Sequence, residues 1–306
     1  MKQKPKIIVV LGPTATGKSD LAVDLALTFN GEVVSADSRQ VYKGLDLGTG
    51  KITKKEMRGV PHHLLNVANP KKRYTVSFFQ IEAKKAIKDI LSRGKLPIIC
   101  GGTGFYIQSI VDDIILPDVP VNQKLRKKLS KKTAVQLYVK LQTLDSKRAK
   151  NIDPHNRVRL IRAIEIASVL GKTPPLKKRS PYDVLQIGLD MEDHVLTEKI
   201  YTRILSRIKK GMISEAKKLH SKGLSYKRMR DLGLEYRFLA DLLEEKIDRR
   251  EFVERLALAS FQYVKKQRAW FKRDKRVQWF NPTKNKIKGL VKIYLSDNKL
   301  NANTGN

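Results

Sequence analysis

Residues 6–19, KIIVVLGPTATGKS, decide the fold of the first part of the chain. Residues 6–11 form an apolar run rich in β-branched side chains, which is typical of a buried strand. Residues 12–19 match the pattern G-x-x-x-x-G-K-[ST], in which backbone N–H groups hold phosphate oxygens ahead of a helix. The next segment, SDLAVDLALTF, puts Leu21, Leu25 and Phe29 on one helical face. Strand, glycine loop and helix together predict a phosphate-binding loop (P-loop).

Further strands and helices alternate along the chain. EVVSA (32–36), LPIIC (96–100), VLQIGLD (184–190) and VQWF (277–280) are expected strands. Ser77 and Gln80 predict a capping box for a helix that stops near Gly94. Long amphipathic helices are expected from about His194 to His220 and from about Arg249 to Lys272. The alternation predicts an α/β fold, a P-loop-type parallel sheet with helices on both faces.

Residues 118–183 differ from the rest of the chain. Their pattern is almost entirely helical and rich in Lys and Arg, and it ends in the turn-forming cluster GKTPPLKKRSP (171–181). We therefore expect a helical insertion domain at 118–183, placed within a P-loop catalytic core formed by residues 1–117 and 184–306.

Composition restricts the functions that are possible. Lys and Arg number 63 against 30 Asp and Glu, a net charge of +33. Such an excess favours a polyanionic partner, most often nucleic acid, although a general basic bias of the source proteome is an alternative. The single Cys100 excludes an internal disulfide and a multi-cysteine metal site. No apolar run reaches the roughly 18 residues of a membrane helix, so we expect a cytoplasmic protein.

The P-loop predicts chemistry at phosphate groups. Lys18 would reach a terminal phosphate, and the Ser19 hydroxyl would ligate Mg²⁺. An ATPase also needs an acid at a second strand end, but the strand at 96–100 ends in Cys100 and Gly101. The acid at a nearby strand end is Asp37, in SADSRQVY. Asp37 can anchor a metal, act as a general base beside phosphates, or cap a turn, and these residues alone leave the choice open.

Five stretches then resemble one family. GPTATGKS, SADSRQVYKGLDLGTGK, GVPHHLLNV, GGTGFYIQSI and DPHNRVRLIRAIEI occur in this order and are similar to the tRNA dimethylallyltransferases, from the N-terminus to about Trp270. The resemblance implies transfer of a dimethylallyl group from dimethylallyl diphosphate to the exocyclic amine of the adenosine next to the anticodon. The loop would then bind the departing diphosphate, with Mg²⁺. The resemblance implies that the donor site includes Gly12, Pro13, Thr14, Ala15, Thr16, Gly17, Lys18 and Ser19, with the helical pair Arg203 and Arg207.

The same resemblance implies the residues that meet the RNA. Asp37 matches the family's proposed base, and Thr103 matches a residue near the reacting centre that also contacts RNA. Ser38, Arg39 and Gln40 match the segment that holds the target nucleotide. The tRNA anticodon stem-loop would also be contacted by Arg126, Arg157, Val158, Arg159, Leu160 and Ile161. We expect no membrane contact and a monomer.

Three positions depart from the family pattern. Asn66 stands where Asp is usual, LGLEYR (232–237) replaces a GYKE-like stretch, and Phe261 stands where Arg is common. His62 and His63 match a family PHH stretch, and we expect them to be structural or to position a loop, with no metal role. Two other functions stay open: a P-loop kinase that uses ATP on nucleotides or polynucleotide ends, and a non-catalytic RNA-binding protein that retains the loop.

Overall fold

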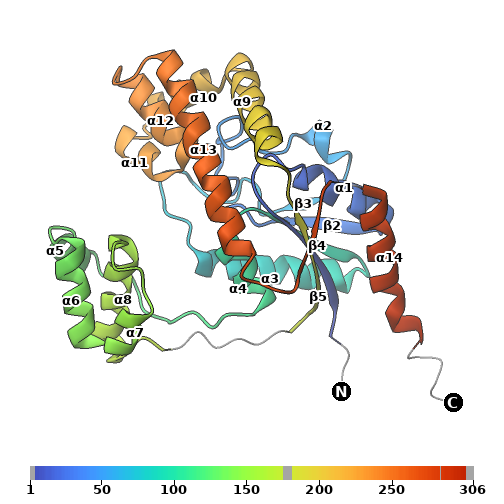
Figure 1. The fold of residues 1–306 in the computed structure, drawn as a ribbon, viewed down its shortest axis with the longest axis horizontal. Coiled ribbons are helices and arrows are strands. Elements are labelled where there is room, and N and C mark those ends of the chain that lie inside the picture. The colour runs from blue at the N-terminus through green and yellow to red at the C-terminus, as the bar shows by residue number, and fades with distance from the viewer. Residues whose placement is uncertain (1–3, 175–180, 283, 301–306) are drawn as a thin grey trace. The chain divides into compact units, whose positions relative to one another are not determined.

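The computed structural model describes residues 4–174, 181–282 and 284–300, and most of the linker expected at 171–181 lies outside them. It forms two compact units. The first, called here the core unit, combines Met1–Asp113 with Ser180–Asn306, and the second, the helical unit, is Ile114–Arg179 (Figure 1). The role of the helical unit in RNA binding stays a prediction.

The core unit is built on a six-stranded sheet with the order β3-β2-β4-β1-β5-β6. All its paired strands are parallel, which confirms the predicted α/β class. The strands are β1 (Lys6–Leu11), β2 (Gly31–Ser35), β3 (His62–His63), β4 (Leu96–Gly101), β5 (Asp183–Leu189) and β6 (Val277–Phe280). Because every strand runs the same way, their carboxyl ends share one edge, where ligands of open α/β sheets bind.

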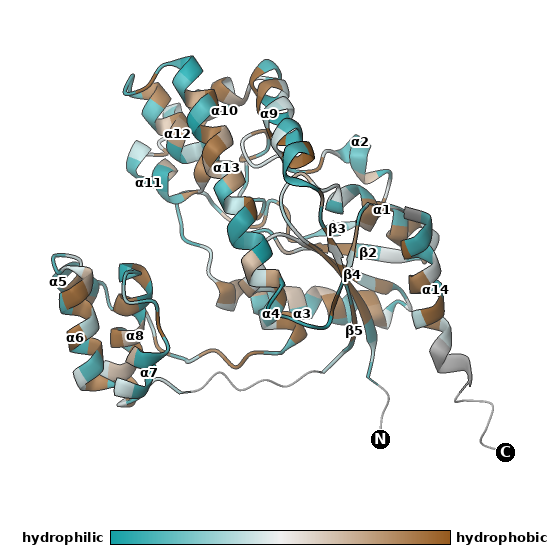
Figure 2. Ribbon diagram, in the orientation of Figure 1, coloured by the Kyte–Doolittle hydropathy of each residue, from teal (hydrophilic) through white to brown (hydrophobic). Residues whose placement is uncertain are grey.

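Alternate residues of the strand β1 point to opposite faces of the sheet. Ile7 and Val9 pack towards α3 (Val76–Ser92) and α4 (Gly104–Val111), together with Phe271 of α13 (Arg249–Phe271). Ile8 and Val10 pack towards α1 (Lys18–Thr28) and α14 (Lys284–Leu300). Both faces are therefore covered, and Figure 2 shows hydrophobic residues gathered along the strands and on parts of the flanking helices.

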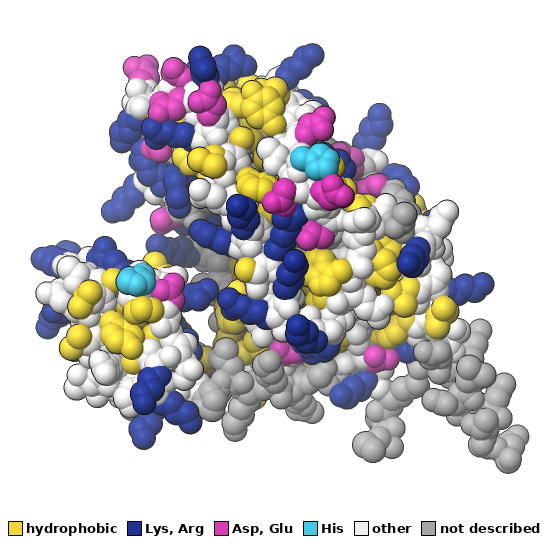
Figure 3. All heavy atoms as spheres, viewed as in Figure 1, with side chains coloured by type: hydrophobic (Ala, Val, Ile, Leu, Met, Phe, Trp, Pro, Cys, Tyr) yellow, Lys and Arg dark blue, Asp and Glu magenta, His cyan; other side chains and the backbone are white. Residues whose placement is uncertain are grey.

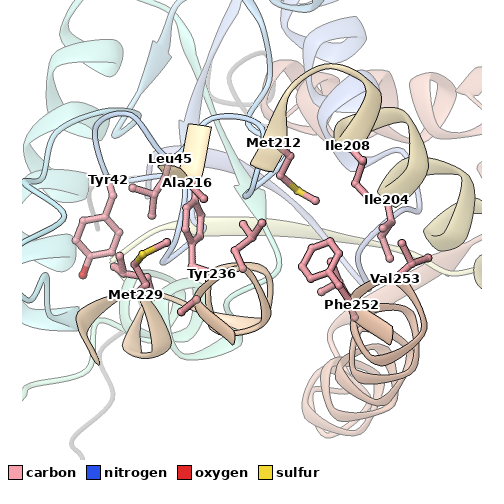
Figure 4. Packing of buried hydrophobic residues seen from close by; sticks show 14 of the residues in the cluster. Tyr42, Leu45, Ile204, Ile208, Met212, Ala216, Met229, Tyr236, Phe252 and Val253 are labelled. Carbon is pink, nitrogen blue, oxygen red and sulfur yellow. The ribbon is translucent and has the colours of Figure 1, made fainter. Parts of the chain in front are cut away.

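A third hydrophobic cluster lies among helices that follow β5. It joins α9 (Asp193–Lys209), α10 (Met212–Ser221), α11 (Tyr226–Asp231), α12 (Leu234–Leu243) and α13 to the segment around Tyr42 and Leu45. Figure 4 shows Tyr236 and Phe252 within this packing, and both are fully buried. The cluster fixes α9 and α12, which contribute cavity-lining residues described below.

Two local predictions were wrong. The helix expected across 194–220 is two helices, because Gly211 takes a left-handed backbone (φ 101°) and starts α10. The helix expected to be capped by Ser77 and Gln80 is capped instead by Thr75, whose side chain accepts from the N–H of Phe78. Gln80 is buried and donates to the carbonyl of Ser109, so it serves packing between α3 and α4. The short helix α2 (Lys54–Met57) completes the core unit.

The helical unit contains α5 (Gln123–Leu129), α6 (Ala134–Leu144), α7 (Ser146–Lys150) and α8 (Arg157–Leu170). Its own small core includes Leu137, Leu141 and Leu160, all fully buried. Lys and Arg side chains are spread over the drawn faces of both units in Figure 3.

Across the described ranges, every helix is too short or too polar to cross a membrane. The expected cytoplasmic location and the expected monomer stay predictions.

Candidate functional site

The glycine loop follows β1 and leads into α1, as predicted. Gly12 has φ 134°, and a Cβ there would lie 2.2 Å from the carbonyl oxygen of Leu189 on β5. A side chain is therefore excluded where the loop leaves the sheet. Thr16 is buried, and its hydroxyl donates to the Pro13 carbonyl at 3.0 Å. The ammonium of Lys18 also donates to that carbonyl. These bonds shape the loop from inside.

Two further strand ends meet beside the loop. Asp37 follows β2, and Thr103 follows β4 and starts α4. The Thr103 N–H donates to the Ala36 carbonyl at 3.2 Å, and the Ser38 N–H donates to the Thr103 hydroxyl at 3.0 Å. The parallel strands thus bring residues separated by more than sixty positions into one layer at the carboxyl edge.

One cavity of about 1110 Å³ opens at this edge. It contains most of the core-unit residues that the sequence pointed to: Thr14, Ala15, Gly17, Lys18, Ser19, Asp37, Ser38, Arg39, Gln40, Arg203 and Arg207. Pro13, Thr16 and Thr103 support its wall through the bonds described above, and Gly12 lies where the loop leaves the sheet. Lys18 and Asp37 therefore face a common space, as a reaction between two bound substrates requires.

The carboxylate of Asp37 is held in a fixed orientation. Its Oδ1 accepts the N–H groups of Arg39 at 2.8 Å and Gln40 at 3.3 Å, an Asx turn. No described residue donates a hydrogen bond to its other oxygen in this structure, which leaves that oxygen available to accept a proton. Burial and Asp37 raise the pKa of Tyr263, another lining residue, to about 12, so its hydroxyl remains a donor.

Cations dominate the electrostatics near the loop. Burial, with a smaller contribution from Arg203, lowers the pKa of Lys18 to about 8. Burial and the neighbouring Arg207 lower the pKa of Arg203 to about 10. Both shifts mean that the positive forms are disfavoured in the free protein. A bound polyanion would relieve this repulsion, so the cavity is suited to an anionic ligand.

The same cavity also has an apolar wall. Ile52, Ile200, Ile204 and Leu234 line it together with Arg203 and Arg207. Ile200 and Ile204 come from one face of α9, in the cluster that fixes this helix. A ligand with an anionic end and a short hydrocarbon part would thus find complementary surfaces in one cavity.

Sequence reasoning missed Gln267 of α13. Its Oε1 accepts the Thr14 N–H at 3.0 Å, and its Nε2 donates to the Gly102 carbonyl at 2.9 Å. Gln267 is nearly fully buried and joins the glycine loop to the segment before Thr103. The stretch KKQRAWF offers no periodic signal for this bridge, because the partners lie far away in the sequence.

The positions that depart from the family pattern have definite partners. Asn66 has φ 57°, which suits Asn, and its Oδ1 accepts from the Lys51 ammonium at 2.6 Å. Tyr236, in the LGLEYR stretch, donates its hydroxyl to Glu215. Phe261 packs against the helical cluster, with Lys265 over its ring at 5.1 Å.

The two histidines belong to the structure around β3. His63 contacts the buried carboxylate of Glu32 at 2.8 Å, and the His62 ring lies 2.9 Å from the Val60 carbonyl. Burial lowers the pKa of His62. His62 also lines the cavity. Because its pKa is lowered, its ring is neutral near neutral pH.

The helical unit divides the predicted RNA-binding residues into two groups. Arg157, Val158 and Arg159 are exposed at the start of α8, where Arg157 also donates to the Ser130 carbonyl at 2.6 Å. Leu160 is fully buried, Ile161 is half-buried against the same core, and Arg126 is tied to the buried Glu165 by two hydrogen bonds of 2.7 and 2.6 Å.

Fold and cavity together define a P-loop α/β enzyme class in which an anion-binding loop and a carboxylate share one site.

The family described as IPP transferase matches residues 40–274, and the family described as isopentenyl transferase matches residues 5–71. A tRNA dimethylallyltransferase from Anoxybacillus flavithermus is 41% identical over 288 residues, covering 92% of each chain. A tRNA dimethylallyltransferase 2 from Treponema denticola is 44% identical over 279 residues, covering 89% of this chain and 93% of the relative.

Comparison with solved structures points to the same family as the sequence comparisons. The full-length tRNA isopentenylpyrophosphate transferase from Bacillus halodurans is 36% identical, with a TM-score of 0.74 over 98% of this chain and 100% of that one. A eukaryotic dimethylallyltransferase acting on tRNA is 27% identical, with a TM-score of 0.74 over 87% of this chain and 70% of that one. None of these proteins is named as a kinase. The chain belongs to the IPP transferase family, whose relatives here are tRNA dimethylallyltransferases.

Proposed function

We propose that the chain transfers a dimethylallyl group from dimethylallyl diphosphate to the exocyclic amine of the adenosine next to the anticodon of tRNA. Family membership supports this reaction, and one observation of the structure carries it to named residues. Lys18 and Asp37 line the same cavity, so a group leaving at the loop and an amine deprotonated by the acid can be bound together.

The donor fits the loop end of the cavity. Its diphosphate would be bound by the loop N–H groups and by Lys18, Arg203 and Arg207, while the apolar wall accepts the five-carbon chain. Negative charge grows on the diphosphate as its bond to the allylic carbon breaks. Fixed cations at that position stabilise the transition state more than the ground state.

Magnesium fits this end of the site. The Ser19 hydroxyl lines the cavity beside Lys18, and the hydroxyl at this loop position is the one that holds Mg²⁺ together with substrate phosphates and water. When bound, Mg²⁺ would neutralise charge on the leaving diphosphate. Ser19 is the side chain we assign to hold it.

The acceptor would enter beside Asp37. The adenine amine attacks the allylic carbon, the bond to diphosphate breaks, and the amine loses one proton to the available carboxylate oxygen of Asp37. The N–H groups of Arg39 and Gln40 hold this acid, and the Ser38 N–H is bonded to the Thr103 hydroxyl. A base already in a single-stranded loop leaves its stack at a cost of a few kcal/mol or less.

RNA contacts outside the cavity are assigned to the exposed start of α8, with Arg157, Val158 and Arg159. Arg126 and Leu160 act from within the helical unit, because one is paired with Glu165 and the other is buried. The net charge of +33 supports electrostatic attraction of the tRNA to the chain.

The test is transfer of label from dimethylallyl diphosphate to unmodified tRNA with Mg²⁺. We expect label in the RNA, none when the target adenosine is replaced by guanosine, and no phosphorylation of RNA from labelled ATP. Asp37→Asn should lower turnover by roughly 10²–10⁴ while tRNA still binds. Asp89→Asn, a change of the same type in an acid paired with Arg93 on the outer side of α3, is the matched control. Labelled phosphate in the RNA, or transfer equal in Asp37→Asn and wild type, would refute the proposal.

A further inference from the structure

Residues 46–51, DLGTGK, form a short segment that one carboxylate holds in place. Glu215 of α10 accepts three successive backbone N–H groups, from Asp46 at 3.0 Å, Leu47 at 2.8 Å and Gly48 at 2.9 Å. The hydroxyl of the fully buried Tyr236 donates to the same carboxylate. Both oxygens of Glu215 are therefore engaged in fixing the path of this segment.

Two glycines let the segment pass close to neighbouring side chains. A Cβ on Gly48 would lie 2.6 Å from the ring of Tyr236, which Figure 4 shows within the helical cluster. A Cβ on Gly50, where φ is 59°, would lie 2.1 Å from a guanidinium nitrogen of Arg207. The backbone at 48–50 thus forms a wall directly against Arg207.

Polar contacts reach from this wall to both substrate positions in the cavity. The Arg207 guanidinium donates to the Gly48 carbonyl at 3.4 Å and contacts Glu235 at 3.5 Å. Gln40, beside Asp37, donates to the Gly50 carbonyl at 3.4 Å. Thr49 and Gly50 themselves line the cavity, whereas Glu215 does not.

A second buried group fixes the end of the segment. The Lys51 ammonium donates to the Tyr42 carbonyl at 2.7 Å, to Asp46 at 2.7 Å and to Asn66 at 2.6 Å. Lys51 is 8% exposed, so the segment is held at its end independently of Glu215. Loss of Glu215 should therefore displace residues 46–50 locally without releasing the whole loop.

We propose that Glu215 is a positioning residue for donor binding: it acts through residues 46–50 to fix the Arg207 guanidinium at the diphosphate end of the cavity. This inference rests on the proposed function. Glu215 touches neither substrate. Its effect passes through the Gly48 carbonyl and the close contact at Gly50, and a shifted wall would leave Arg207 oriented by its ion pair with Glu235.

The variant Glu215→Gln tests the proposal with little change in shape. A carboxamide offers one acceptor oxygen where the carboxylate offers two, so its NH₂ must face at least one of the donors now bound. We expect the KM for dimethylallyl diphosphate and the Kd for inorganic diphosphate with Mg²⁺ to rise about tenfold, as for loss of one charge-assisted contact. The KM for tRNA should rise less than the KM for dimethylallyl diphosphate, because the tRNA side meets this segment through the long Gln40–Gly50 contact at 3.4 Å. Glu254→Gln, in the exposed pair with Arg250, is the matched control.

A double-mutant cycle separates positioning from a general structural role. In an Arg207→Ala background, Glu215→Gln should raise the Kd for diphosphate no further, because the group it positions is gone. Additive losses, or an unchanged Kd in Glu215→Gln alone, would overturn the inference, and so would an equal rise in the KM for tRNA. Diphosphate binding by calorimetry needs no turnover. A wild-type chain that binds diphosphate but transfers no label would count against the proposed function instead.

Discussion

The lowered pKa of Lys18 predicts a specific pH dependence of diphosphate binding. In the free protein, burial and Arg203 bring this pKa down to about 8. Lys18 is then about nine-tenths protonated at pH 7, half at pH 8 and about one-tenth at pH 9. A bound diphosphate stabilises the ammonium and raises its pKa in the complex. The protonated fraction of Lys18 therefore falls about tenfold from pH 7 to pH 9, and this group should raise the Kd about tenfold in total across that range.

Calorimetric titration of inorganic diphosphate with Mg²⁺ between pH 7 and pH 9 measures this slope. Inorganic diphosphate loses its own last proton near the upper end of this range, so the pH dependence that comes from the ligand is measured separately with a Lys18 variant. The upper limit avoids Arg203, whose pKa is about 10. Lys18→Arg is the control: its guanidinium keeps its charge, so the Kd should be higher at pH 7 and should change with pH only as the ligand loses its proton. A wild-type Kd with the same pH dependence as that of Lys18→Arg would refute the reasoning.

Three other changes probe the parts of the molecule that support this site. Gln267→Leu leaves the Gly102 carbonyl and the Thr14 N–H without their partner. It should therefore lower the free energy of unfolding by about 1–3 kcal/mol per group and weaken diphosphate binding. An unchanged denaturation midpoint would contradict this. Glu165→Gln breaks the pair between the buried Glu165 and Arg126, so it should destabilise the helical unit by about 3 kcal/mol. The destabilisation is measured as faster amide exchange in α8. Exchange rates equal to those of the wild type would show that the pair is dispensable. Arg159→Glu should weaken tRNA binding and lower its salt slope by about one, and an unaltered slope would mean that the RNA lies elsewhere.

The sequence predicted the parts of the site that follow from local pattern. Apolar runs of strand length end just before Gly12, Asp37 and Gly102, and parallel strands bring such ends to one edge. The structure confirms this parallel arrangement, and it places the loop, Asp37 and Thr103 together. The helix across 194–220 was less predictable, because its apolar period continues while a single left-handed Gly211 interrupts the backbone.

The remaining site residues depend on contacts between distant parts of the chain. Gln267 is 253 positions from Thr14, and Glu215 is 169 from Asp46. A glutamine or glutamate on an amphipathic helix usually faces solvent, and nothing in the neighbouring residues distinguishes these two. Their partners are backbone groups, and the type of a side chain does not indicate which backbone group will accept or donate a hydrogen bond to it. Only the packing of α10 and α13 against the loops that follow β1, β2 and β4 reveals them.

Two departures from the family pattern meet at the segment 46–51. Asn66 accepts from Lys51 at one end of the segment, and Tyr236 donates to Glu215 beneath its middle. With the neutral Asn66, Lys51 is balanced by the single carboxylate of Asp46, whereas an Asp at position 66 would add a second negative charge beside a buried ammonium. Lys18 and Asp37 match the residues that the family resemblance assigns to the chemistry. Under the proposed role of Glu215, the contact made by Tyr236 bears on how Arg207 is held and leaves the bond-breaking chemistry unchanged.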